Sequence, residues 1–253
     1  MKTVILCGGL GSRLSEETTK KPKPMVKIGK KPILIHILEI YKKYGYKEFI
    51  LATGYKHRFI DQYFKLNKKF NVKTIFTGRN TLTAGRILKL KKHFKPGENF
   101  LLTYGDGISS HNIKRSVNFH LKNKKVATLT AVRPPVRFGE LDVKKNLVKR
   151  FNEKPQAKQG WINGGYFIFN YEIFNYIKSF NTMLEREPMN LLVRKKNLAC
   201  YKHEGFWQCM DTLRDKKFIE QMIKKKILLG YKLNYEKKNF SYGFTWSRKN
   251  YFG

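Results

Sequence analysis

The chain is poor in acidic residues, in cysteine and in long apolar runs. Against 53 Lys and Arg it has only 18 Asp and Glu, a formal net charge of +35 over 253 residues. Its three cysteines, Cys7, Cys200 and Cys209, show no metal-binding or redox spacing, and their odd number argues against a disulfide framework. No apolar run is as long as a membrane span, and the stretch Thr3–Cys7 is too short for a signal-peptide core. We therefore expect a soluble cytoplasmic protein without an integral membrane segment.

The positive charge is built mainly from lysine. The chain has 41 Lys and 12 Arg, and the lysines are scattered in pairs such as Lys42-Lys43 and Lys91-Lys92. Lysine supplies a solvated point charge, whereas the planar fork of arginine is the group suited to reading base edges. This composition favours a solvated surface that attracts anionic ligands at long range, and we expect no nucleic-acid partner. The hydrophobic fraction of 41% is sufficient for a folded core.

Strand and helix patterns alternate along the first half of the chain. Short apolar runs predict strands over 3–7, 49–53, 72–76 and 100–104, and helical spacing predicts helices over 33–44, 57–66 and 86–94. In the second half we expect strands over 127–132 and 166–170, a hairpin within 143–151, and helices near 171–178, 188–196 and 213–227. This order predicts an α/β fold with a Rossmann-like, mostly parallel sheet flanked by helices.

A glycine-rich loop, Gly8-Gly9-Leu10-Gly11-Ser12-Arg13-Leu14, follows the first predicted strand directly. Glycines let backbone N–H groups approach a phosphate or a base, and ligands of α/β sheets bind at the carboxyl ends of strands. The spacing differs from both the dinucleotide fingerprint and the Walker loop. Lys23 follows between two prolines, which fix the chain around this cation. The alternative is an ordinary glycine turn with solvated lysines.

Several longer motifs occur in a recognisable order. They are GGLGSRL (8–14), KPKPMV (21–26), GRNTLTAGR (78–86), TYGDG (103–107), RFG (137–139), FNEKP (151–155), WINGG (161–165) and EGFWQCMDTLRD (204–215). On these residues the chain resembles the sugar-1-phosphate nucleotidyltransferases, and within them the glucose-1-phosphate cytidylyltransferases. The resemblance covers roughly residues 1–65 and 75–220 and implies the nucleotide-diphospho-sugar transferase fold.

The resemblance implies that CTP and glucose 1-phosphate react to CDP-glucose and pyrophosphate with Mg²⁺ as cofactor. A sugar-phosphate oxygen attacks the α-phosphorus in line, so the protein acts mainly by positioning and by charge stabilisation. The catalytic residues it implies are Arg13 and Lys23 on the phosphates, and Asp106 and Asp211 as the metal ligands. A single Asp at a strand end is otherwise often a helix cap or a turn residue. No covalent nucleophile or proton-abstracting base is needed, because the sugar phosphate is already ionised.

The resemblance also implies the substrate contacts. Nucleotide binding falls to Leu6, Gly8, Gly9, Gly11, Ser12, Arg13, Lys23, Thr81, Arg86 and Gly105, with Thr81 and Arg86 at the polar edge of cytosine. Sugar-phosphate binding falls to Tyr104, Gly139, Glu153, Lys154, Asn163, Gly164 and Trp207. Related thymidylyl- and uridylyl-transferring enzymes carry Gly-Leu-Ala where this chain has Thr83-Ala84-Gly85-Arg86, which supports cytidine. From the residues alone, Arg86 could instead be a structural or phosphate-binding arginine, and Trp207 could instead be a core residue.

We expect one nucleotidyltransferase domain over 1–229, with nucleotide binding in about 1–110 and sugar binding and the second metal ligand in about 111–229. The aromatic and lysine-rich segment 230–253 has no predicted role. The stretch between Phe64 and Thr77 is shorter than in the family, where it contributes subunit contacts, so a homo-oligomer remains an open expectation. The alternatives are the same reaction with another nucleotide or sugar 1-phosphate, and a non-catalytic nucleotide-sugar- or anion-binding relative. The family context also suggests nucleotide-sugar supply for polysaccharide biosynthesis.

Overall fold

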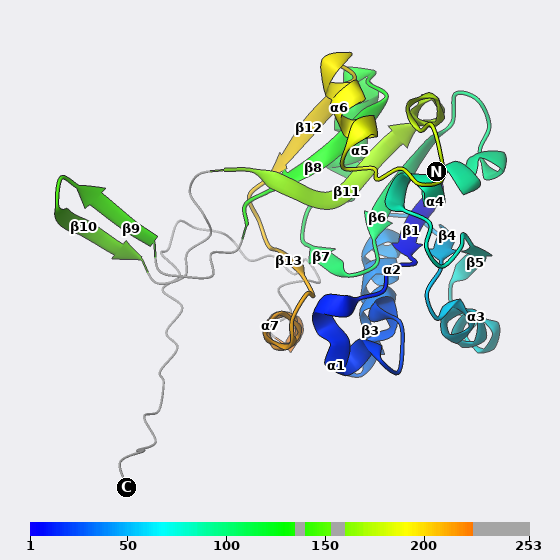
Figure 1. Ribbon diagram of the computed structural model, residues 1–253, viewed down its shortest axis with the longest axis horizontal. Coiled ribbons are helices and arrows are strands. Elements are labelled where there is room, and N and C mark those ends of the chain that lie inside the picture. The colour runs from blue at the N-terminus through cyan, green and yellow to red at the C-terminus, as the bar shows by residue number, and fades with distance from the viewer. Residues whose placement is uncertain (135–139, 153–159, 225–253) are drawn as a thin grey trace, which may run out of the picture.

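Seven strands in the described part of the chain form one mostly parallel sheet at the centre of the molecule (Figure 1). The computed structural model describes residues 1–134, 140–152 and 160–224. The strand order is β12-β8-β11-β6-β1-β4-β5. Strand β11 runs antiparallel to β6 and β8, and the other neighbouring pairs are parallel. The predicted Rossmann-like, mostly parallel α/β fold is therefore confirmed.

Helices alternate with strands along the chain, and besides the seven-stranded sheet there are three two-stranded sheets in the described residues, β2–β3, β7–β13 and β9–β10. The strands are β1 (Thr3–Cys7), β2 (Lys27–Ile28), β3 (Lys31–Pro32), β4 (Glu48–Thr53), β5 (Asn71–Phe76), β6 (Asn99–Tyr104), β7 (Gly107–Ser109), β8 (Ala127–Val132), β9 (Glu140–Lys144), β10 (Leu147–Asn152), β11 (Ile162–Asn170), β12 (Leu198–His203) and β13 (Trp207–Cys209). The α-helices are α1 (Ser15–Thr18), α2 (Ile33–Lys43), α3 (His57–Leu66), α4 (Thr83–Lys89), α5 (Ile113–Asn123), α6 (Glu187–Arg194) and α7 (Leu213–Lys224). Short 3-10 helices are η1 (Ser12–Leu14), η2 (Lys23–Met25), η3 (Lys91–His93) and η4 (Tyr171–Tyr176).

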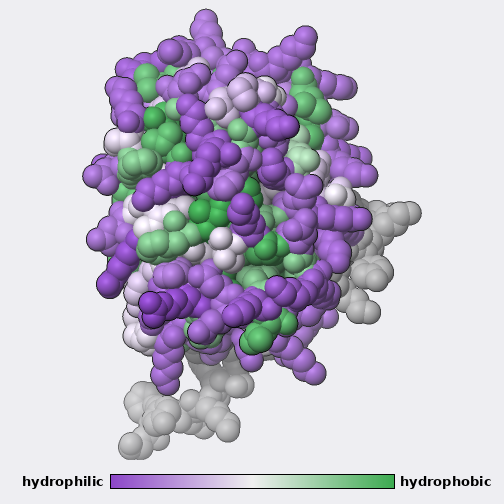
Figure 2. Space-filling view, turned by 90° about the vertical axis from the view of Figure 1, so that its right-hand side faces the viewer, coloured by the Kyte–Doolittle hydropathy of each residue, from purple (hydrophilic) through white to green (hydrophobic). Residues whose placement is uncertain are grey.

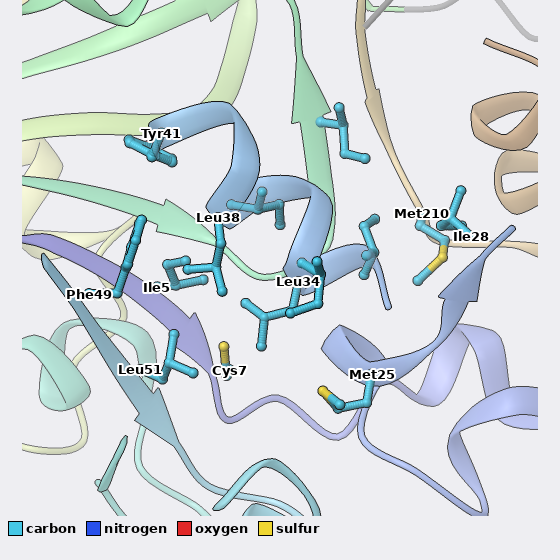
Figure 3. Close-up of a cluster of buried hydrophobic side chains, with 14 of the residues drawn as sticks. Ile5, Cys7, Met25, Ile28, Leu34, Leu38, Tyr41, Phe49, Leu51 and Met210 are labelled. Carbon is cyan, nitrogen blue, oxygen red and sulfur yellow. The ribbon is translucent and has the colours of Figure 1, made fainter. Parts of the chain in front are cut away.

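The core lies on both faces of the sheet, which explains the continuous apolar run of β1. Side chains alternate along a strand, so Ile5 and Cys7 face one cluster and Val4 and Leu6 face the other. The first cluster lies under α2, α3, α5 and α7, and the second lies under α4, α6 and η4. Figure 3 shows the first cluster, where side chains of α2 point toward the β1 and β4 side chains Ile5, Phe49 and Leu51.

Among the elements in the described residues that were absent from the sequence prediction, α5 and β12 are the longest. Helix α5 buries Ile113, Ser116, Val117 and His120, so half of its inner face is polar and its apolar period is weak. The helix predicted over 86–94 is corrected: α4 covers Thr83–Lys89 and is followed by the separate 3-10 helix η3. The stretch predicted as a helix near 171–178 is the 3-10 helix η4.

The predicted hairpin within 143–151 is confirmed as the antiparallel pair β9–β10. The helix predicted over 213–227 is described as α7 up to Lys224, and its predicted last residues lie outside the described part of the chain. The segment 230–253 also lies outside it. Figure 2 shows hydrophilic residues spread over one whole face of the molecule, with smaller apolar patches between them. Within the described ranges, no helix is both long enough and apolar enough to cross a membrane.

Candidate active site

The glycine-rich loop lies at the carboxyl end of β1, where the backbone is packed too closely for larger residues. Gly11 has a φ of 70°, in the left-handed region, and a Cβ there would lie 2.9 Å from Thr18 Cγ2. A Cβ on Gly8 would lie 2.1 Å from the Cζ atom of Arg86. Glycine at these two positions therefore lets the loop pass against α1 and against the Arg86 side chain.

Arg86 connects the loops that follow three neighbouring strands. Its side chain comes from α4 and is buried. Nη2 donates to the Gly8 carbonyl oxygen at 3.0 Å, while Nη1 donates to the Gly78 carbonyl oxygen at 2.8 Å and to Thr77 Oγ1 at 2.7 Å. Nη1 also lies 3.2 Å from the carbonyl oxygen of Thr53, at the end of β4. One guanidinium thus fixes the loops after β1, β4 and β5 relative to one another.

Two carboxylates and two cations meet beside this loop. The ammonium of Lys23 lies between the carboxylates, 2.6 Å from Asp106 Oδ2 and 2.7 Å from Asp211 Oδ1. Arg13 Nη1 lies 2.7 Å from the other oxygen of Asp211. The Lys23 side chain is only 9% exposed. The four residues predicted to be catalytic are therefore brought together as one cluster with balanced formal charge.

A short two-stranded sheet brings Asp211 to Asp106. Strand β13 pairs antiparallel with β7, and the Met210 N–H donates to the Asp106 carbonyl oxygen at 2.8 Å. Asp215, near the start of α7, accepts from the Asp211 N–H at 3.1 Å and from the Thr212 N–H at 2.9 Å. Asp215 caps this turn and holds Asp211 in place, a role that the sequence prediction missed although Asp215 belongs to the quoted motif.

The ion pairs stabilise the charged forms of these groups. Burial opposes the charge on Lys23, but Asp106 and Asp211 outweigh it and raise the pKa of its ammonium above the ordinary value. Burial likewise acts against the Asp211 carboxylate, but the hydrogen bond from Lys23 and the charges of Lys23 and Arg13 lower its pKa below the ordinary value. At neutral pH these shifts favour the ammonium form of Lys23 and the carboxylate form of Asp211.

The carboxylate pair fits the requirements of Mg²⁺. Two carboxylates already enclose one cation, the Lys23 ammonium, and Mg²⁺ is commonly held by one or two carboxylates with phosphate oxygens and waters. Within the described residues, no group of three or more His, Cys, Asp and Glu side chains could hold a metal by itself. This donor set suits a hard ion that takes its remaining ligands from a phosphate and from solvent.

A pocket of about 610 Å³ opens between the glycine-rich loop and the start of α4. Most of the predicted site residues line it: Leu6, Gly8, Gly9, Gly11, Ser12, Arg13, Lys23, Thr81, Arg86, Tyr104, Gly105 and Asp106. Arg79, Met183 and Glu185 line it as well and were not predicted. The segment holding Met183 and Glu185 belongs to none of the recognised motifs, and only the tertiary structure brings it here.

Of the residues predicted for the sugar side, only Tyr104 is among the described residues that line this pocket. The Tyr104 ring packs against Gly165, where an added Cβ would lie 2.5 Å from Tyr104 Cδ2. Trp207 Nε1 donates to the Gly164 carbonyl oxygen at 2.7 Å, and the Gly165 N–H donates to Asn163 Oδ1 at 2.9 Å. Asn163, Gly164 and Trp207 are in contact through this turn but do not line the pocket. Gly139, Glu153 and Lys154 lie outside the described residues.

Known proteins are similar to this chain over most of its length. Residues 2–218 match the family described as nucleotidyl transferase. The glucose-1-phosphate cytidylyltransferase of Salmonella typhimurium is 43% identical over 248 residues, which cover 89% of this chain and 96% of that protein. A probable glucose-1-phosphate cytidylyltransferase of Bacillus subtilis is 41% identical, with 85% and 93% covered.

The fold is also found among solved structures. HddC from Yersinia pseudotuberculosis, solved as a complex with GMP-PN, has a TM-score of 0.70 and 24% identity, and the match covers 88% of this chain and 99% of that one. Similarity over nearly the whole length of these proteins, together with the loop, cation and carboxylate arrangement at the strand ends, shows that the chain belongs to the nucleotidyl transferase family.

Proposed function

We propose that the protein transfers a cytidylyl group from CTP to glucose 1-phosphate, releasing pyrophosphate and forming CDP-glucose. One observation carries the proposal: Arg13, Lys23, Asp106 and Asp211 meet in one cluster beside a glycine-rich loop and a pocket of about 610 Å³. Similarity to cytidylyltransferases over almost their full length supports the choice of reaction.

The cluster suits a reaction between two anions. An oxygen of the sugar phosphate forms a bond to the α-phosphorus of CTP, and the bond from that phosphorus to the oxygen bridging to the β-phosphorus breaks. Arg13 and Lys23 hold the phosphates together and balance the charge that develops on them. No side chain has to remove a proton from the attacking phosphate oxygen.

Asp106 and Asp211 would hold Mg²⁺ in this proposal. When bound, the ion supplies charge neutralisation and orientation of phosphate oxygens. Lys23 currently contacts one oxygen of each carboxylate, so we assign it the task of moving between the carboxylates and the phosphates. The turn that Asp215 caps keeps Asp211 at a fixed distance from Asp106 during this exchange.

Thr81 provides a reason for choosing cytosine over uracil. Thr81 lines the pocket, and its hydroxyl donates to the Thr77 carbonyl oxygen at 2.6 Å and accepts from Lys89 Nζ at 3.4 Å, so its remaining lone pair can serve a ligand only as an acceptor. Cytosine carries an amino group as donor at the position where uracil and thymine carry a carbonyl acceptor. The Thr81 oxygen is therefore matched to the cytosine amino group, while Arg86 holds the loops on which the base lies.

The same proposal divides the chain by task. Residues up to about 110 bind the nucleotide, and residues 111–229 add the sugar contacts and the second carboxylate. We propose that the reaction takes place in the cytoplasm, where CTP is available. We also propose that the protein forms a homo-oligomer, as the family resemblance suggests. Gly139, Glu153, Lys154, Asn163, Gly164 and Trp207 remain the proposed sugar-phosphate contacts.

Pyrophosphate release tests the proposal directly. The purified protein is offered each of CTP, UTP, dTTP, ATP and GTP with glucose 1-phosphate, and with other sugar 1-phosphates, in the presence of Mg²⁺. Release with CTP and glucose 1-phosphate is expected. Release only with UTP or dTTP contradicts the base, release only with another sugar contradicts the sugar, and no release with any pair favours a non-catalytic binding protein.

A further inference from the structure

Glu185 brings a carboxylate into the pocket that neither the metal pair nor the phosphate contacts use. It lies in the segment before α6 and lines the pocket together with Tyr104 and Thr83. Its Oε1 accepts a hydrogen bond from the Tyr104 hydroxyl, and its Oε2 accepts one from Thr83 Oγ1 at 2.8 Å. The side chain is exposed to the pocket despite these two bonds.

The partners of Glu185 are neutral hydroxyl groups. Among the described residues it forms no ion pair, unlike Asp106 and Asp211. An ionised carboxylate has about four acceptor positions, so roughly two remain after the bonds from Tyr104 and Thr83. The remaining positions require hydrogen-bond donors, and an anion would be repelled from them.

Sugar hydroxyls are the donors that the substrates can supply at this position. Phosphates are polyanions, and the proposed function places them against the cations Arg13 and Lys23, which also line the pocket. Thr83 starts α4, on the same helix as Arg86, while Tyr104 immediately precedes Gly105-Asp106 and packs on Gly165. Glu185 therefore lies where a sugar can meet it, between the base side and the sugar side of the site.

We propose that Glu185 binds a substrate by accepting hydrogen bonds from sugar hydroxyls and so contributes to sugar specificity. Thr83 and Tyr104 orient the carboxylate by occupying one lone pair on each oxygen. The ligand group is a pair of neighbouring hydroxyls on a sugar ring. Both the ribose of the nucleotide and the hexose of the sugar phosphate carry such hydroxyls. This inference rests on the proposed function and names a residue for that same site.

Two series of deoxy analogues test the proposal and distinguish the two sugars. One series compares CTP with its 2′-deoxy and 3′-deoxy forms, and the other compares glucose 1-phosphate with its monodeoxy analogues. KM and kcat are measured for the wild type, for Glu185→Gln and for Glu185→Ala. Glu187→Gln serves as the matched control, because Glu187 pairs with Lys178 at 2.7 Å and does not line the pocket.

We expect Glu185→Gln to raise one substrate's KM about 10-fold or more, the size of a lost hydrogen bond to a charged acceptor, with a smaller effect on kcat. The wild type should discriminate against the matching deoxy analogue, and Glu185→Gln should lose that discrimination. Loss in the CTP series assigns the contact to ribose, and loss in the glucose 1-phosphate series assigns it to the hexose.

Unchanged discrimination in both series overturns the proposal. A purely structural Glu185 is recognised by lower thermal stability of Glu185→Gln with unchanged KM values and unchanged discrimination, which also overturns it. If Glu185→Ala does not fold, Glu185→Gln decides alone, because it keeps the length and one acceptor of the side chain. Wild-type turnover tests the proposed function separately: absence of any turnover contradicts that function, whereas turnover with unaltered discrimination contradicts only the role of Glu185.

Discussion

Lys23→Met should destabilise the protein and make its stability depend on Mg²⁺. Methionine keeps the approximate length of the side chain but removes the charge that lies 2.6 Å from Asp106 Oδ2 and 2.7 Å from Asp211 Oδ1. The two carboxylates then face each other, and only Asp211 keeps a cation, Arg13.

The magnitude follows from burial. Removing one partner of a buried ion pair costs about 3 to 5 kcal/mol. The Asp106 side chain is 27% exposed and can be solvated in part, so the lower end applies, about 3 kcal/mol. For a protein of this size, that free energy corresponds to a fall in Tm of about 6 to 12 °C.

Mg²⁺ should recover much of this loss, because it can take the position that the ammonium leaves. Binding to the folded state at about 100 times Kd stabilises a protein by about 2.7 kcal/mol. In the wild type, Lys23 already occupies the position between the carboxylates, so Mg²⁺ alone should raise its Tm much less. Thermal unfolding of both proteins, with EDTA and over a Mg²⁺ series, measures the difference.

Lys21→Met is the matched control for this experiment. Lys21 is two residues away and pairs with Glu17 at 3.1 Å, away from the carboxylate pair, and Glu17 keeps Lys216 as a second cation when Lys21 is lost. Its loss should cost at most about 1 kcal/mol and should not respond to Mg²⁺. The reasoning is refuted if Lys23→Met is as stable as the wild type in EDTA, or if Mg²⁺ raises the Tm of both proteins equally.

Three further predictions concern turnover, loop packing and pH. Asp106→Asn should lower kcat about 100-fold or more, as expected for a lost electrostatic contact, and near-normal pyrophosphate release would contradict the proposed site. Gly8→Ala should cost about 1 to 3 kcal/mol in urea unfolding, because its Cβ would lie 2.1 Å from the Arg86 guanidinium; an unchanged midpoint would show that Arg86 moves freely. Burial lowers the pKa of His111 to about 3 and that of His120 to about 4. Both histidines therefore stay neutral in the folded state, while in the unfolded chain they bind protons below about pH 6.5. The free energy of unfolding should then fall between about pH 6.5 and pH 4, by up to about 1.4 kcal/mol per pH unit for each histidine. His120→Gln should flatten this slope in unfolding measured at several pH values, and an identical slope would contradict the assignment.

The sequence predicted elements well where one physical signal was dominant. Strand β1 is buried on both faces and therefore appears as an unbroken apolar run, and α3 shows a clear helical period. Helix α5 was missed because Ser116 and His120 occupy two of its buried positions. The buried His120 ring bonds to Thr128 Oγ1 at 2.8 Å, a contact that no local pattern indicates.

Within the candidate site, too, some residues could be predicted from the sequence and others could not. The cluster of Arg13, Lys23, Asp106 and Asp211 was predicted from the family resemblance, because each residue lies in one of the short motifs that carry it. Glu185 was not predicted, since its position depends on contacts with Thr83 and Tyr104, which lie far from it in the sequence. The extent of the hydrogen bonding by Arg86 could not be predicted either, because its partners belong to loops after three different strands.

The antiparallel strand β11 limits how this enzyme can be divided. Strand β6 lies in the part of the chain up to about residue 110 for which we propose nucleotide binding, yet one of its edges is paired with β11, which comes from the later part. A fragment ending near residue 110 would present that edge unpaired, with the apolar side chains of Phe100, Leu101 and Leu102 next to it, and would tend to aggregate. The two parts are therefore not interchangeable modules. Exchanging the later part, for which we propose sugar binding, for that of another enzyme would require a strand that matches the register of β6.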